Sequence, residues 1–172
     1  MSPLVALSVS IGILGGIATI ICLKFGLLIW AAFIAWGCYF HSGGDSAALQ
    51  KTIAGNILGA VLAWIGALII LSVPLGDKLG LPLWAGIVVG VTVFLICVAA
   101  TIKTFSVIPA NVYGYAAVFA FLLQTPGSMT KDKLLSGGLG NALIVVVISM
   151  ILGAIFAIIS QKFAATMTAK AP

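Results

Sequence analysis

The sequence has very few charged side chains, and this scarcity excludes a water-soluble domain. Only 6% of its 172 residues are charged, and arginine and glutamate are absent. A soluble domain carries about 25% charged residues. The hydrophobic share is 63% and the mean hydropathy is +1.33. The solvent of such a surface must be lipid, so we expect an integral membrane protein whose main partner is the lipid bilayer.

The few polar groups that could carry chemistry are dispersed. His41 is the only histidine, and the three acids, Asp45, Asp77 and Asp132, lie in loops. The sequence lacks the paired carboxylates, nucleophile triad or phosphate-binding loop of an enzyme. The three cysteines form no CxxC pair, and the eight lysines are scattered singly at the ends of apolar runs. We therefore expect no enzyme, no metal, no cofactor and no nucleic acid.

Six apolar runs predict an all-α protein with six transmembrane helices. The runs cover residues 4–23, 27–41, 52–73, 83–102, 107–123 and 139–160, with Gly, Pro, Ser and Asp concentrated between them. In lipid each segment must satisfy its own backbone hydrogen bonds, so runs this apolar form helices. No lysine precedes Lys24, so the first run lacks the basic start of a signal peptide and is read as a retained helix. The second and fifth runs are the shortest and are strongly tilted, broken or only partly spanning.

A repeat relates the two halves of the chain. A shift of 79 positions places residues 4–40 on residues 83–119, with Lys24 on Lys103 at the same helix boundary. Gly55-Asn56 and Gly140-Asn141 each open the third run of their half. Residues 1–75 and 82–163 are thus predicted as three-helix repeats, followed by a polar C-terminal tail at 164–172. Three is odd, so the second repeat enters the membrane from the opposite face, as in many transporters.

Six spans place both termini on the same side of the membrane. The eight lysines then divide equally between the two faces, so the positive-inside rule gives no orientation. Lys170 on the tail favours a cytoplasmic carboxyl terminus. Three GxxxG pairs, Gly12/Gly16, Gly55/Gly59 and Gly86/Gly90, predict close helix contacts. Contacts within the chain are favoured, and contacts between the subunits of a homo-oligomer are the alternative.

The second and fifth runs hold most of the aromatic and amide groups and are the candidate lining of a solute path. Asn111 and Tyr115 share a helix face, and Trp36 is the repeat partner of Tyr115. A pore role and a packing role both stay open for these three residues, and an interfacial aromatic belt is favoured for Trp30, Tyr39 and Trp84. His41 is a candidate pH gate, although a solvated histidine at a helix end is the favoured alternative. The full candidate set is Asn111, Tyr115, Trp36, Tyr113, Phe40, Phe119, Pro109 and Trp30, with His41 as the gate.

The absence of ionisable side chains from the middle of the apolar runs indicates what kind of transport to expect. A proton-coupled carrier usually holds an ionisable side chain at mid-membrane, and the runs contain none there. We therefore expect a passive channel or facilitator for a small uncharged polar solute of the urea, amide or polyol class. The alternatives are a non-transporting membrane scaffold or partner subunit, and an ion-coupled carrier of small solutes.

Two short segments carry a resemblance to a known family. The stretch Phe25-Gly26-Leu27-Leu28-Ile29-Trp30-Ala31-Ala32-Phe33, followed by Tyr39-Phe40 and Gly43-Gly44, is the first. Phe105-Ser106-Val107-Ile108-Pro109, followed by Gly114 and Phe119-Ala120, is the second. On these residues the chain resembles the YcdZ-like family of bacterial inner-membrane proteins, a domain of unknown function. The resemblance implies a bacterial inner (plasma) membrane location and implies no activity.

Overall fold

The computed structural model describes residues 1–168, and that range contains helices and no strand. Four apolar helices are long enough to cross a membrane, with α5 counted together with the 3-10 turn η1 (Ala99–Thr101). They are α1 (Pro3–Phe25), α3 (Ser46–Ser72), α5 (Leu81–Val98) and α8 (Ala142–Met167). The shorter apolar helices α2 (Ile29–His41) and α6 (Ile108–Gln124) complete the six predicted runs. The all-helical membrane fold is therefore confirmed.

Helix ends in this chain are capped by side chains and by glycine. The side chains of Ser2, Asp45 and Asn141 accept hydrogen bonds from backbone amides in the first turns of α1, α3 and α8. Gly26 follows α1 with a φ of 68°, a left-handed conformation that glycine adopts without strain. Pro109 lies in the first turn of α6, where its missing amide hydrogen breaks no helical bond. Capping residues and a proline thus mark where α1, α3, α6 and α8 begin.

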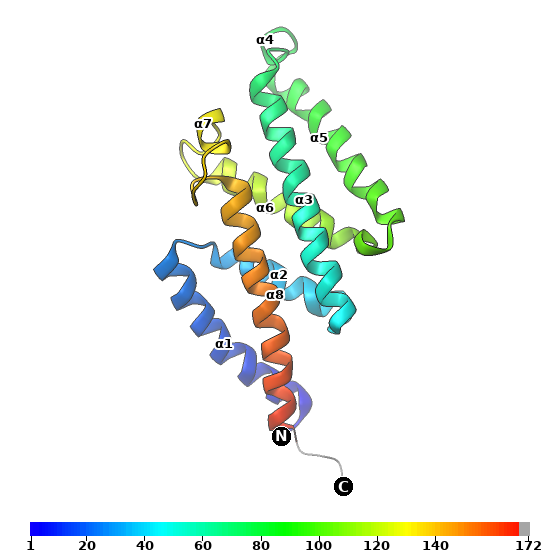
Figure 1. The fold of residues 1–172 in the computed structure, drawn as a ribbon, viewed down its shortest axis with the longest axis vertical. Helices are drawn as coiled ribbons and strands as arrows, with labels where there is room; N and C mark the ends of the chain where they lie inside the picture. Colours follow the sequence, from blue (N-terminus) through cyan, green and yellow to red (C-terminus); the bar gives the residue numbers. More distant parts are fainter. Residues whose placement is uncertain (169–172) are drawn as a thin grey trace.

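The third helix of each half packs on the helices of the other half. Contacts between α3 and α6, and between α8 and α2, are the most extensive in the molecule. In addition α8 packs on α1, and α3 packs on α5. Figure 1 shows α3 and α8 running in opposite directions through the centre, while α2 and α6 cross them. The two halves are therefore joined by an exchange of their long helices.

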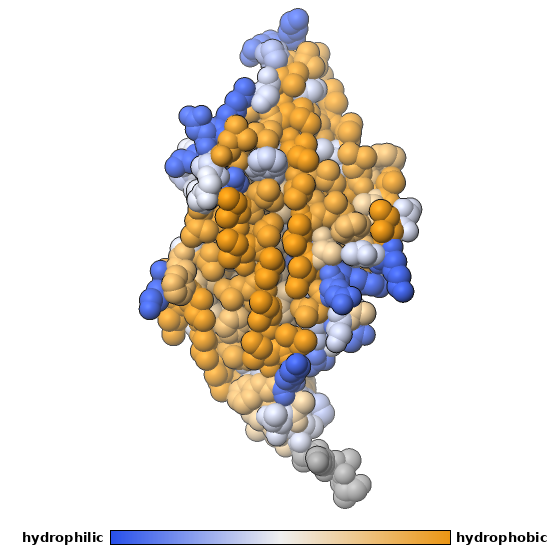
Figure 2. Space-filling view, viewed as in Figure 1, coloured by the Kyte–Doolittle hydropathy of each residue, from blue (hydrophilic) through white to orange (hydrophobic). Residues whose placement is uncertain are grey.

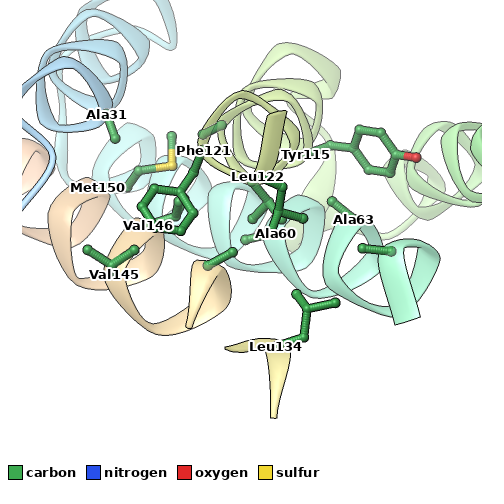
Figure 3. Packing of buried hydrophobic residues seen from close by; sticks show 14 of the residues in the cluster. Ala31, Ala60, Ala63, Tyr115, Phe121, Leu122, Leu134, Val145, Val146 and Met150 are labelled. Carbon is green, nitrogen blue, oxygen red and sulfur yellow. The ribbon is translucent and has the colours of Figure 1, made fainter. Parts of the chain in front are cut away.

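Glycine allows backbones to touch at both central crossings. A β-carbon on Gly59 of α3 would overlap the carbonyl oxygen of Asn111 on α6. A β-carbon on Gly153 of α8 would overlap the carbonyl oxygen of Ala32 on α2 in the same way. Gly114 of α6 meets the carbonyl oxygen of Asn56 equally closely. Alanines and a few larger side chains fill the remaining core, part of which is drawn in Figure 3.

The three GxxxG pairs behave differently. Gly55 and Gly59 pack directly on α6, so contact within the chain is confirmed for this pair. A β-carbon on any glycine of the pairs Gly12/Gly16 and Gly86/Gly90 would meet nothing within 4 Å. These two pairs therefore make no close helix contact within residues 1–168.

Two of the sequence boundaries need correction. Gly55 and Asn56 lie well inside α3, whereas Asn141 is the residue that caps α8. The predicted pairing of Gly55-Asn56 with Gly140-Asn141 is wrong, because composition alone cannot tell a helix start from a buried helix turn. The helix α8 also continues to Met167, so residues 164–167 of the predicted tail are helical. Lys170, on which the predicted orientation depended, lies outside the described residues.

The surface divides into an apolar band and two hydrophilic edges. Figure 2 shows hydrophilic residues gathered along the upper left and the lower right, with hydrophobic side chains between them. In Figure 1 the upper-left edge holds the α1–α2 turn, α4 (Gly76–Leu79) and α7 (Lys131–Leu134). The opposite edge holds the α2–α3 turn, the α5–α6 connection with η2 (Lys103–Phe105), and the end of α8.

Candidate functional site

A hollow of about 480 Å³ lies between α2 and α6, the two helices expected to line a solute path. Side chains of α2 form most of its wall, and two residues of α6 complete it. The lining residues are Phe33, Ile34, Gly37, Cys38, Tyr113 and Ala116. Phe33 and Ile34 are partly exposed, so the hollow opens to the apolar surface. The Tyr113 side chain is the one predicted candidate that lines it.

Asn111 is fully buried and its amide group is bound to the backbone of its own half. Its Nδ2 donates to the carbonyl oxygens of Ile96 and Phe105, each at 3.0 Å. These bonds tie the end of α5 and the turn η2 to the first turns of α6. Its Oδ1 has no hydrogen-bond partner among the residues that the structure describes. Asn111 thus offers an acceptor, and both of its donor hydrogens are already engaged.

Trp36 and Tyr115 are both buried, but the structure does not bring them together. The Trp36 indole nitrogen donates to Ser160 Oγ of α8 at 3.1 Å, and its ring lies 5.8 Å from that of Phe156. The Tyr115 hydroxyl shares a hydrogen bond of 2.7 Å with Thr92 of α5. The two rings belong to separate hydrophobic clusters. They therefore do not face each other as the two walls of one narrow passage.

The other aromatic candidates lie on the flanks of these clusters. The Phe119 ring lies 5.2 Å from that of Tyr115, and the Phe40 ring lies 5.2 Å from that of Tyr39. Trp30 is 37% exposed and lines a second hollow of about 290 Å³ between the start of α2 and the end of α6. Neither Phe40 nor Phe119 lines the hollow between α2 and α6.

His41 and Tyr39 lie near the end of α2 in different surroundings. His41 is the last residue of the helix and is exposed, as a solvated helix-end histidine would be. Tyr39 is fully buried, and its hydroxyl donates to the carbonyl oxygen of Gly44 at 2.7 Å and contacts Gln161 Oε1 of α8. The aromatic-belt assignment is wrong for Tyr39, because its hydroxyl joins α2 to α8 inside the protein.

The structure adds a polar pair that the sequence reasoning missed. Thr52 and Asn56 lie one turn apart on α3 and are almost completely buried. Thr52 Oγ1 and both polar atoms of the Asn56 amide lack a hydrogen-bond partner within the described part of the chain. The Thr52 hydroxyl lies beside the Cys38 thiol. The signal in the sequence was an amide four residues after a threonine inside an apolar run.

The described interior offers hydrogen-bonding groups and no cluster of metal ligands. Among residues 1–168, no three His, Cys, Asp or Glu side chains are close enough to hold a metal ion. Besides the Tyr39 and Tyr115 hydroxyls and the Trp36 indole, the buried polar side chains in that range are serines, threonines and asparagines. This chemistry suits a neutral ligand with donors and acceptors.

Comparison with known proteins identifies a family for this chain and finds no solved structure that matches it. A family model described as "Protein of unknown function (DUF1097)" matches residues 8–165. The chain is also similar to the inner membrane protein YcdZ of Escherichia coli strain K12, with 28% identity over 122 residues. That match covers 70% of this chain and 71% of YcdZ. No solved structure matches.

Proposed function

This chain belongs to the DUF1097 family and is a multi-pass protein of the bacterial inner membrane, and from that premise we propose that it is a passive facilitator for a small uncharged polar solute. The observation that carries the proposal is the neutrality of the interior. The buried polar groups of the described chain are the side chains of serine, threonine and asparagine, the hydroxyls of Tyr39 and Tyr115 and the indole of Trp36, and no Asp, Glu, Lys or His is buried among residues 1–168. A coupled carrier needs a buried group that takes up and releases an ion. A neutral solute needs only hydrogen-bond donors and acceptors along its path.

The proposed topology has six crossings. The connections alternate between the two hydrophilic edges, so α2 and α6 also run from one edge to the other (Figures 1 and 2). With 13 and 17 residues they are about 20 and 26 Å long at 1.5 Å per residue, short for a core of about 30 Å. The amino group of Met1 donates to the carbonyl oxygen of Met167 at 3.4 Å, so the ends of the described chain are adjacent. Reporter fusions should place both termini on one face, and opposite faces would exclude six spans.

The inverted repeat is part of this proposal and rests on two matching contacts. Gly59 touches the carbonyl of Asn111, and Gly153 touches the carbonyl of Ala32. Asn111 and Ala32 are related by the repeat offset of 79 (111 − 32), and the two glycines by an offset of 94 (153 − 59). The second offset also brings α3 onto α8 within two residues at each end. An inverted pair of three-helix units would place the solute path between α2 and α6.

The test is a solute panel on purified protein in liposomes. Stopped-flow light scattering should show faster entry of acetamide, urea or glycerol than in empty liposomes. The flux should follow the solute gradient and should not respond to a proton or sodium gradient. Accumulation above equilibrium that collapses with the proton gradient would instead establish a coupled carrier, and His41 would be the first residue to replace.

A membrane scaffold is the second candidate, and the tight central packing favours it. The backbone contacts of Gly59, Gly114 and Gly153 leave no room between the crossing helices at those points. The exposed pairs Gly12/Gly16 and Gly86/Gly90 would then serve association with further copies. Ordinary liposome permeability for the whole panel, with a stable oligomer in light scattering, would support this function over transport.

A further inference from the structure

Four buried polar atoms are grouped where α3 passes α6 and the end of α2, and none has a hydrogen-bond partner within residues 1–168. They are Thr52 Oγ1, Asn56 Nδ2, Asn56 Oδ1 and Asn111 Oδ1. All three side chains are at most 2% exposed. An unpaired polar group in an apolar interior is strongly unfavourable, and a complete side-chain amide with no partner is rare. The group therefore marks a place where hydrogen bonds to something other than this chain would be gained.

The group adjoins the hollow between α2 and α6. Cys38 belongs to both, because it lines the hollow and its thiol lies beside Thr52. Asn56 is one helical turn beyond Thr52 on the same side of α3. On the α6 side, Gly114 touches the backbone of Asn56, so the two helices are in direct contact at this residue. A small solute in the hollow is thus separated from Thr52 by the small Cys38 side chain, and Asn56 lies one turn further along α3.

The related place in the other half has no such group. With the offset of 94, Thr52 corresponds to Val146 and Asn56 to Met150. These residues pack against Ala31 and Phe121 in the apolar cluster of Figure 3. Ser149, the counterpart of Gly55, is polar, but it donates to the Val145 carbonyl and accepts from the Leu28 amide. The crossing thus packs with apolar side chains at the counterparts of Thr52 and Asn56, so polar residues at positions 52 and 56 are not required by the packing of the helices.

We propose that Thr52 and Asn56 bind a neutral solute that both donates and accepts hydrogen bonds, of the amide or urea type, and that the solute reaches them past Cys38. The inference rests on the proposed transport function and names its binding residues and ligand class. Asn56 supplies one amide donor and one carbonyl acceptor, which is the complement of a primary amide. Thr52 supplies a hydroxyl that can turn to either role. Asn111 Oδ1 adds an acceptor on the α6 side.

The test replaces each polar residue by the apolar residue of the other half. Asn56→Met and Thr52→Val should each lower acetamide flux in liposomes by about tenfold, the factor that one ordinary hydrogen bond carries. The melting temperature of each variant should equal or exceed that of the parent, because an unpaired buried group is removed. Met150→Leu is the matched control in the apolar half and should leave flux unchanged.

A binding measurement separates this site from the transport proposal. Acetamide at high millimolar concentration should raise the melting temperature of the parent and not of Asn56→Met. Acetone, which accepts but cannot donate, should raise it less. Binding without flux would keep the site and remove the transport function. Normal flux in Thr52→Val and Asn56→Met, or a large drop in the melting temperature of either variant without acetamide, would overturn the site.

Discussion

The crossing of α3 with α6 and the crossing of α8 with α2 share the same backbone contact but differ in the side chains around it. In each, a glycine of the long helix touches a backbone carbonyl of the short helix. Around Gly153 the neighbouring positions of α8 carry Val146 and Met150, whereas around Gly59 the positions of α3 carry Thr52 and Asn56. Ala32 on α2 corresponds to Asn111 on α6. The close approach of the helices is therefore independent of the unpaired polar groups, which among residues 1–168 lie at only one of these two crossings.

This difference separates residues that hold the fold from residues available for binding. The Asn111 amide hydrogens, the Trp36 indole and the Tyr115 hydroxyl are all engaged within the protein. The Asn56 amide and the Thr52 hydroxyl are not. Buried polar groups without an internal partner are the better candidates for a ligand site.

The largest expected effect should be the same at both crossings. Gly59→Ala and Gly153→Ala each place a methyl group onto a backbone oxygen that cannot move aside easily. Each should destabilise the protein by about 3 kcal/mol or more, through overpacking. Thermal melting of the purified variants measures this loss.

The controls for that experiment are Gly12→Ala and Gly86→Ala, whose β-carbons meet nothing within 4 Å. They should be neutral or stabilising by up to about 1 kcal/mol, since alanine favours a helix over glycine. If only one of the two central glycines tolerated alanine, the two crossings would not share the same close backbone contact.

A smaller effect should distinguish the crossings. Asn111→Ala removes two hydrogen bonds to the Ile96 and Phe105 carbonyls and should destabilise the protein by about 2 kcal/mol. Thr101→Val, in the same connection, removes one exposed bond to the Val98 carbonyl and should have little effect. Melting and solute flux should be measured on the same samples. An Asn111→Ala variant that melts normally but transports nothing would assign Asn111 to the path.

The smallest effect concerns the repeat partners Trp36 and Tyr115. Trp36→Phe loses the bond to Ser160, and Tyr115→Phe loses the bond to Thr92. Each should destabilise by about 1 kcal/mol and leave flux unchanged, because each ring would keep most of its packing. A clear loss of solute flux in either variant, with a melting temperature close to that of the parent, would assign that residue to the solute path.

The helices could be predicted from the sequence, because apolar runs in lipid have one solution for their backbone hydrogen bonds. The faces of the helices could not be predicted. Almost every position is apolar, so periodicity does not distinguish buried Tyr39 from exposed Trp30. Asn56 was overlooked for this reason, since its burial against α6 cannot be read from an apolar run.

The exchange of long helices has a consequence for how the protein is made. α8 leaves the ribosome after the other helices described here, and it provides the main packing surface for α2 and much of that for α1. α3 likewise finds its partners α5 and α6 only after they have been synthesised. The first half cannot complete its packing alone, and contacts this distant in sequence form slowly. Insertion should therefore hold early helices in a loosely packed state until translation ends, and a chain that stops before α8 should be degraded rather than accumulate.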